Sequence, residues 1–221
     1  MSVWSAKNRS ALRARATSNP EDRPILLPPT LISVVRTLKV HAGILGASVA
    51  ALWAVFAVDT LLGGALQHYG VVPRTIEGLR GIVLAPFLHG SLSHLSANTA
   101  SLLVLGWLVL LRDPRHFWIV AMLAMFGGGV VAWLLGAGNS VHIGASGVIF
   151  GFLGFLIFAG WYARSFGSIL LSIVVSVLWG GLVFGVLPGE PGLSWQEHLG
   201  GFAGGVLAAR WFSPGRRIIS G

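Results

Sequence analysis

The chain has 221 residues, of which 54% are hydrophobic and only 10% are charged, a balance typical of integral membrane proteins rather than large soluble domains. It has no cysteine, which excludes disulfide bonds, thiolate metal sites and cysteine nucleophiles. The net charge is +8, but the basic residues gather at the chain ends and in short connections, so we expect no nucleic-acid partner.

The first 40 residues are rich in lysine, arginine and proline. This composition predicts a basic, disordered cytoplasmic tail over 1–40, and its long charged stretch argues against a cleaved signal peptide. A second short basic tail is predicted in the cytoplasm at 214–221. Residues 41–213, between the two tails, form the expected membrane domain.

Six apolar segments of about membrane-spanning length occupy this domain. They lie at about 42–62, 92–111, 117–136, 145–163, 167–187 and 195–212. A longer connection, 63–91, joins the first two, whereas the other connections are short, so consecutive segments should be antiparallel. The expected fold is all-α: a polytopic membrane protein whose six transmembrane helices form a bundle.

The lysines and arginines predict the orientation of these spans. With the N-terminus inside the cell, all of them except Arg74 and Arg80 fall on the cytoplasmic side. This asymmetry favours a multi-pass protein of the cell membrane with both termini in the cytoplasm. The second, fourth and sixth segments then run from outside to inside.

A polar motif lies at the start of each of these three segments. The motifs are His89-Gly-Ser-Leu-Ser-His94-Leu-Ser-Ala-Asn98, Gly144-Ala-Ser146-Gly147 and Ser194-Trp-Gln-Glu-His198-Leu-Gly-Gly201. Counted from the cytoplasmic arginines at about 1.5 Å per residue, all three belong to the outer half of the membrane. Ionisable or reactive side chains at that depth are costly and indicate function. We therefore expect one site that opens to the extracytoplasmic side.

Ser146 and His198 are the candidate catalytic pair. A serine is a poor nucleophile unless a base takes its proton, and His198 can be that base. Gly201 and Gly205 share the helical face of His198, so the sixth segment can press against the fourth. The alternatives are a small-residue packing motif around Ser146 and a histidine that only bonds a carbonyl or water. Because no acidic partner is evident apart from Asp59, we expect a dyad.

His94 and Asn98 can stabilise negative charge on a carbonyl oxygen. They are four residues apart, on one face of the second segment, and both can donate hydrogen bonds. The first amides of a helix that begins near Ser146 are unpaired and can join them. A metal site is the alternative for the histidines, but no His-Glu-x-x-His motif is present. We expect neither a metal nor a cofactor.

These motifs closely resemble the rhomboid family of intramembrane serine proteases, over about residues 42–212. The resemblance implies a bacterial member with a six-helix core, a lipid bilayer as its setting and transmembrane proteins as its substrates. It also implies that Ser146 is the nucleophile and His198 the general base. The remaining implied site residues are His94, Asn98 and Ala145 at the oxyanion hole and His89, Phe150 and Gly144 as auxiliary members. Phe150 corresponds to a family position at which an aromatic ring packs on the catalytic histidine.

The chain departs from the family pattern in its first outer loop and its second segment. The Trp-Arg pair that many members carry in this loop is not evident, and Arg80 is the nearest candidate. The glutamate often found late in the second segment is also missing. Both features concern the rigidity of the loop and helix ends more than the chemistry.

Two other classes of function remain open. One is a catalytically inactive rhomboid-like protein that binds membrane helices, against which the intact Ser146 and His198 argue. The other is a small transporter or channel, against which the scarcity of ionisable residues in the inner half argues. The sequence predicts neither the oligomeric state nor the physiological substrate.

Overall fold

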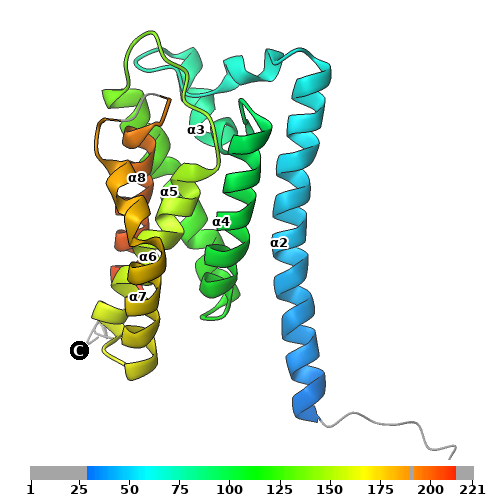
Figure 1. The fold of residues 1–221 in the computed structure, drawn as a ribbon, viewed down its shortest axis with the longest axis vertical. Coiled ribbons are helices and arrows are strands. Elements are labelled where there is room, and N and C mark those ends of the chain that lie inside the picture. The colour runs from blue at the N-terminus through cyan, green and yellow to red at the C-terminus, as the bar shows by residue number, and fades with distance from the viewer. Residues whose placement is uncertain (1–28, 190–191, 213–221) are drawn as a thin grey trace, which may run out of the picture. The chain divides into compact units, whose positions relative to one another are not determined.

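The structure is a computed structural model that describes residues 29–189 and 192–212 (Figure 1). Within these ranges the chain forms seven α-helices and several short 3-10 helices, with one isolated β-bridge and no strand. The all-α fold predicted from the sequence is confirmed. The predicted tails fall outside the described residues at 1–28 and at 214–221.

The first described helix, α2 (Pro29–Leu61), begins before the first predicted segment, which starts at 42. Proline suits the first turn of a helix, because its φ is already helical and the N–H that it lacks would be unpaired there. From 30 to 42 no glycine or proline interrupts the helix. The predicted start at 42 rested on the charges of Arg36 and Lys39. These charges disfavour the bilayer core, but they do not prevent a helix from forming. The chain divides into two units between Val40 and His41, and the remaining helices all belong to the second.

The other long helices correspond to the second to sixth predicted segments. They are α4 (Leu92–Leu110), α5 (Pro114–Leu135), α6 (Ser146–Ala163), α7 (Phe166–Trp179) and α8 (Trp195–Trp211). Four of them begin after an N-cap side chain that accepts a hydrogen bond from the first turn: Ser91, Asp113, Ser165 and Ser194. Helix α7 continues as the 3-10 helix η5 (Gly180–Val186). The outer loop contains η2 (Ala65–Tyr69), η3 (Glu77–Arg80), α3 (Gly81–Leu84) and η4 (Ala85–Phe87).

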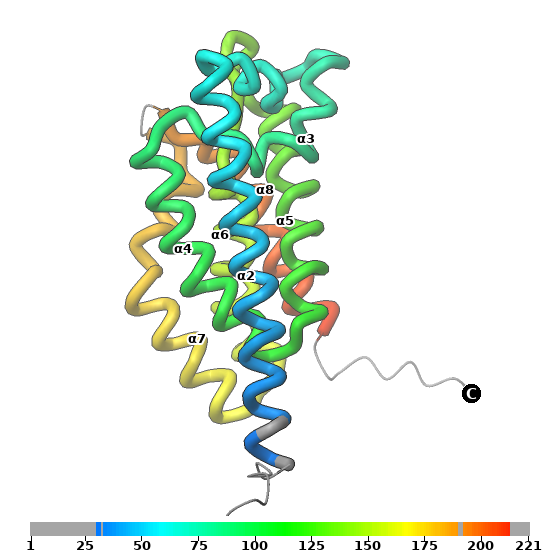
Figure 2. Tube along the Cα trace, turned by 90° about the vertical axis from the view of Figure 1, so that its right-hand side faces the viewer, coloured from blue at the N-terminus to red at the C-terminus, as the bar shows by residue number. Residues whose placement is uncertain are grey.

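Helix α6 is the central helix of the bundle, in contact with α4, α5, α7 and α8 (Figures 1 and 2). Its contact with α8 is backbone against backbone. A Cβ added to Gly201 would collide with the carbonyl of Gly147, and one added to Gly205 would collide with the carbonyl of Gly151. This packing agrees with the prediction that Gly201 and Gly205 bring the sixth segment against the fourth.

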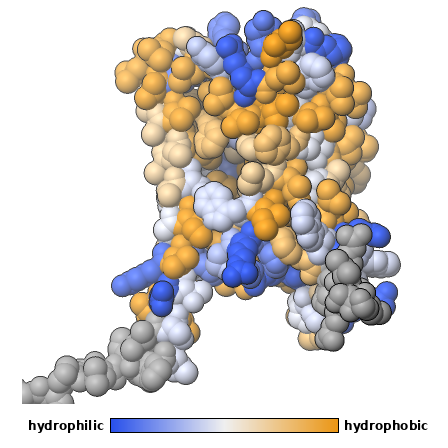
Figure 3. Space-filling view, turned by 180° about the vertical axis from the view of Figure 1, so that it is seen from behind, coloured by the Kyte–Doolittle hydropathy of each residue, from blue (hydrophilic) through white to orange (hydrophobic). Residues whose placement is uncertain are grey.

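Among the described residues, five helical segments are long and apolar enough to cross a membrane. They are Ser33–Leu61, Leu92–Leu110, Pro114–Leu135, Ser146–Ala163 and Phe166–Val186. In the face shown in Figure 3, apolar side chains cover most of the middle and hydrophilic ones gather toward the ends. The protein is therefore a multi-pass membrane protein. The sixth predicted segment forms α8, which has only 17 residues and is covered by α5 and α6.

The outer loop is held by contacts other than the Trp-Arg pair. Arg74 Nη1 donates hydrogen bonds to the carbonyls of Leu134, at 3.1 Å, and Gly136, at 2.7 Å, where α5 ends. The guanidinium of Arg80 lies 4.3 Å from the centre of the Tyr69 ring, a cation–π contact. These interactions order the loop without the Trp-Arg pair of the family pattern.

Candidate active site

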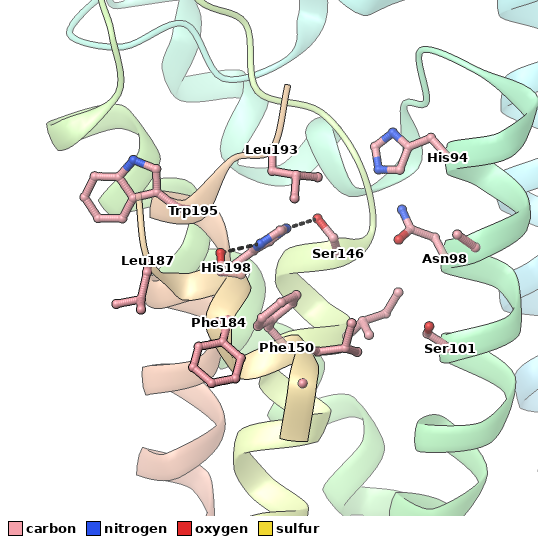
Figure 4. A pocket seen from close by; sticks show the side chains of 15 residues that line it. His94, Asn98, Ser101, Ser146, Phe150, Phe184, Leu187, Leu193, Trp195 and His198 are labelled. Atoms are coloured by element: carbon pink, nitrogen blue, oxygen red, sulfur yellow. Dashed lines mark hydrogen bonds between the residues drawn. The ribbon is translucent and has the colours of Figure 1, made fainter. Parts of the chain in front are cut away.

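Ser146 and His198 lie next to each other, near the starts of α6 and α8 (Figure 4). His198 Nε2 is 2.8 Å from Ser146 Oγ, and His198 Nδ1 is 3.0 Å from the carbonyl oxygen of Gly185 in η5. A carbonyl can only accept, so Nδ1 carries the ring proton. In the neutral imidazole Nε2 is then the acceptor for the Ser146 hydroxyl. This is the tautomer that a general base requires.

Gly144 makes the turn that places Ser146 at the first position of α6. Its φ is 126°, a value that residues with a Cβ rarely adopt. A Cβ would also lie 2.7 Å from Cε1 and 2.8 Å from Nε2 of His94. The amide of Gly144 donates to the carbonyl of Ala85, at 2.9 Å, and so ties the turn to the outer loop. Gly144 is therefore required both for its conformation and for its lack of a side chain.

Phe150, one turn after Ser146 on α6, stacks on His198. The ring centres are 4.0 Å apart and the planes differ by 6°, so the ring contact implied by the resemblance is present. A Cβ on Gly185 would lie 3.0 Å from Phe150 Cζ and 3.4 Å from His198 Nδ1. The imidazole is thus held by a hydroxyl, a carbonyl and an aromatic face. Sequence reasoning missed Gly185, because its contribution comes from the backbone and carries no side-chain signal.

His94 and Asn98 lie across the site from His198, and in Figure 4 both point from α4 toward Ser146. Their Nε2 and Nδ2 atoms also lie close to Gly144, since a Cβ there would be 2.8 Å and 3.5 Å from them. The structure therefore brings together the four residues that the sequence selected from three separate motifs. Their roles at an oxyanion stay a prediction.

His89 is buried behind these donors, with only 1% of its surface exposed. Its Nε2 is 3.0 Å from Asn98 Nδ2 and 3.5 Å from the amide nitrogen of Ala145. Both partners are donors, so Nε2 accepts and the proton is on Nδ1. Burial, together with the neighbouring His94, lowers the pKa of His89 to about 4, which keeps the ring neutral. His89 orients Asn98 and also engages the Ala145 amide, which the prediction had assigned to the oxyanion.

Asp59, the one acidic residue noted as a triad candidate, serves the outer loop instead. Its Oδ1 accepts from the amide of Leu66 at 2.7 Å, and its Oδ2 accepts from Gln67 Nε2 at 3.0 Å. In the part of the chain that the structure describes, no group of three His, Cys, Asp or Glu residues is arranged to hold a metal ion.

A cavity of about 370 Å³ opens beside Ser146. Its polar lining consists of Ser146, His198, His94, Asn98 and Ser101, and its apolar lining includes Ile149, Phe150, Phe184, Leu187, Leu193 and Trp195. A hydroxyl hydrogen-bonded to an imidazole, with hydrogen-bond donors beside a space for substrate, is the arrangement that acyl transfer requires.

These features define a helical, multi-pass membrane protein with a serine–histidine pair beside an apolar cavity. The Rhomboid domain family matches residues 77–215. An uncharacterized protein of Mycobacterium tuberculosis is 41% identical over 178 residues, 76% of this chain and 74% of the relative. RHOMBOID-like protein 4 of Arabidopsis thaliana is 32% identical over 62% of this chain and 35% of its own, and Rhomboid-like protease 5 of Toxoplasma gondii is 30% identical over 74% and 20%. The chain belongs to the rhomboid family.

Proposed function

We propose that this protein is an intramembrane serine endopeptidase. It hydrolyses a peptide bond in or beside a transmembrane helix of a membrane-protein substrate. The observation that carries the proposal is the 2.8 Å contact between Ser146 Oγ and His198 Nε2, on a ring whose Nδ1 is bonded to Gly185. Membership of the rhomboid family supports the same class, since one of the relatives is named a protease.

In the proposed reaction, Ser146 Oγ attacks the carbonyl carbon of the scissile bond and its proton passes to His198 Nε2. His94 and Asn98, with amides at the start of α6, donate to the oxyanion of the tetrahedral intermediate. His198 then protonates the leaving amine, and the C–N bond breaks to leave an acyl-enzyme. Water attacks the ester and its proton passes to His198. The bond from the acyl carbon to Ser146 Oγ then breaks, His198 returns the proton to Oγ, and the carboxyl product leaves. The Gly185 carbonyl occupies the place of the carboxylate in a triad, so the catalytic unit is a dyad.

The proposed setting is the cell membrane, with both termini in the cytoplasm and the site open to the extracytoplasmic side. The membrane domain spans 41–213, between basic tails at 1–40 and 214–221. Support comes from the helix ends: Arg112, Arg164 and Arg210 follow or end α4, α6 and α8, and cytoplasmic ends are enriched in such residues. Ser146 and His198 lie at the opposite ends.

The proposed substrates are transmembrane proteins whose helix unwinds locally near the cut. A helical carbonyl is hydrogen-bonded to an amide one turn later, so a nucleophile reaches it only after the turn opens. Glycine or proline near the scissile bond weakens the helix and promotes this opening. The apolar lining of the cavity suits an extended apolar segment of such a helix.

The test uses purified protein in proteoliposomes with tagged single-span substrates and a fluorophosphonate probe. Wild type is compared with Ser146→Ala, His198→Ala and a control, Ser33→Ala, at an exposed serine of α2. Wild type and the control should label and cleave, whereas the first two variants should lose at least about 10³-fold in rate. Full cleavage by Ser146→Ala would overturn the proposal. Retained helix binding without labelling in wild type would instead indicate an inactive binding protein.

A further inference from the structure

A second histidine–serine pair lies beside the first. His142 precedes Ser146 by four residues, and Ser194 precedes His198 by four residues. His142 Nδ1 is 2.6 Å from Ser194 Oγ, whereas His198 Nε2 is 2.8 Å from Ser146 Oγ. The start of α6, with the segment before it, is therefore joined to the start of α8 by two such bonds, four residues apart along each part of the chain.

The protons of the second pair follow from its neighbours. Ser140 Oγ lies 2.7 Å from the carbonyl of Ala137, to which only the hydroxyl can donate. Ser140 Oγ therefore accepts from His142 Nε2, 3.0 Å away. Burial lowers the pKa of His142, so the ring is neutral and Nδ1 is the acceptor for the Ser194 hydroxyl. In both pairs, then, a serine donates to a histidine.

Ser194 is also the N-cap of α8. Its Oγ accepts from the amide of Glu197 at 3.3 Å, and its carbonyl accepts from the amide of His198 at 3.0 Å. Because the hydroxyl hydrogen goes to His142 and a lone pair to Glu197, Ser194 fixes where the helix begins. The place of the His198 ring follows from that start.

His142 itself is held firmly by the outer loop. Its amide donates to the carbonyl of Val71 at 2.9 Å, and its carbonyl accepts from the amide of Val71 at 3.0 Å. Val71 is fully buried, and a Cβ on Gly136 would lie 2.5 Å from His142 Nε2. The imidazole is therefore a fixed point from which Ser194 can be positioned.

We propose that His142 is a positioning residue for the Ser146–His198 pair. It holds Ser194, and through Ser194 it fixes the start of α8 in the position that brings His198 Nε2 within hydrogen-bond distance of Ser146 Oγ. The inference rests on the proposed proteolytic function. Without the His142–Ser194 bond, the start of α8 can drift away from the turn into α6. A displacement of about 1 Å between reacting groups lowers a rate by roughly 100-fold.

The test compares three substitutions of His142. Asparagine can place its amide oxygen near the position of Nδ1 and accept from Ser194, whereas glutamine reaches the Nε2 side and bonds Ser140. We expect His142→Leu and His142→Gln to lower kcat by roughly tenfold or more, and His142→Asn to keep most of it. KM should stay within about twofold of wild type, because neither His142 nor Ser194 lines the cavity. His68→Asn, at an exposed histidine of the outer loop, is the matched control.

A double-mutant comparison keeps the test decisive if one variant folds poorly. When the bond between the two side chains carries the effect, Ser194→Ala, His142→Leu and the double variant lose kcat to a similar extent. Additive losses, equal kcat for the asparagine and glutamine variants, or a change confined to KM would overturn the inference. If wild type neither labels nor cleaves, the proposed function fails. If wild type is active but His142→Leu matches it, the positioning role alone fails.

Discussion

Helix α7 is apolar and largely exposed, whereas helix α8 is more polar and largely buried. Helix α7 with η5 meets the requirements for a membrane span, yet Phe166 is 83% exposed and Val177 76% exposed. Helix α8 is too short for those requirements, yet Gln196, Glu197 and His198 in its first turn are all buried. In a bilayer the exposed surface must be apolar, and costly polar groups belong inside the protein. Apolarity therefore marks contact with lipid, and buried polarity marks the site.

The glycines of the two helices follow the same division. Every glycine of α8 would bring an added Cβ against the backbone of α5 or α6, as Gly201 does at Gly147. Gly167 in α7 and Gly180 at its end would meet nothing within 4 Å. A change that α7 tolerates should thus damage α8.

The largest expected effect comes from one added methyl group. Gly201→Ala forces the backbones of α6 and α8 apart, because the obstacle is the Gly147 carbonyl rather than a movable side chain. We expect a loss of roughly 1–3 kcal/mol in stability and about 100-fold in labelling rate, as His198 moves away from Ser146. Thermal melting in detergent and fluorophosphonate labelling measure the two effects.

Gly167→Ala is the matched change in α7. It meets open space and replaces glycine by a better helix former, so stability should stay level or rise by up to about 1 kcal/mol. Labelling should not change. Equal sensitivity of the two glycines would break the contrast between the lipid-facing helix and the site-bearing helix.

The positions of the helices were largely predictable, because a bilayer requires long apolar segments. All six predicted segments form helices, and the missed residues of α2 were excluded by charges that do not prevent a helix from forming. The short 3-10 helices of the outer loop were not predictable, since contacts such as that of Arg74 with Gly136 depend on the finished fold.

At the candidate site, the sequence predicted what side-chain types and helix direction determine. Ser146 and His198 meet because their helices run the same way and share a glycine face. The carbonyl of Gly185 and the bond from Ser194 to His142 were missed. His142 lies four residues before Ser146, and Ser194 lies four residues before His198. This equal spacing is visible in the sequence, but it has meaning only once α6 and α8 are known to lie side by side.

His89 allows a test of buried polarity in the pH dependence of stability. It lies outside the spanning part of α4, and its pKa is about 4 against about 6.5 when unfolded. Between these values the unfolded chain binds more protons, so stability is full above about pH 6.5, falls as the pH drops toward 4 and then levels off. We expect a loss of about 3 kcal/mol over this window.

Equilibrium unfolding in detergent at several pH values measures this loss. His89→Gln should flatten the curve between pH 4 and 6.5, whereas His68→Gln, at an exposed histidine, should leave its shape unchanged. An unaltered slope in His89→Gln would show that His89 does not titrate in this window, and that its burial has no part in acid sensitivity.

The smallest expected effect separates two phenylalanines by what they contact. Phe150 is 5% exposed and stacks on His198, whereas Phe166 is 83% exposed on α7. Phe150→Leu removes a ring contact of about 1 kcal/mol, so the imidazole gains freedom and kcat should fall roughly fivefold. Phe150→Tyr keeps the ring and should retain most of the activity, and Phe166→Leu should change stability by less than about 0.5 kcal/mol.

Steady-state cleavage of a single-span substrate compares all three. A kcat for Phe150→Leu equal to that of Phe166→Leu would mean that the hydrogen bonds to Gly185 and Ser146 orient His198 without help from the stacked ring.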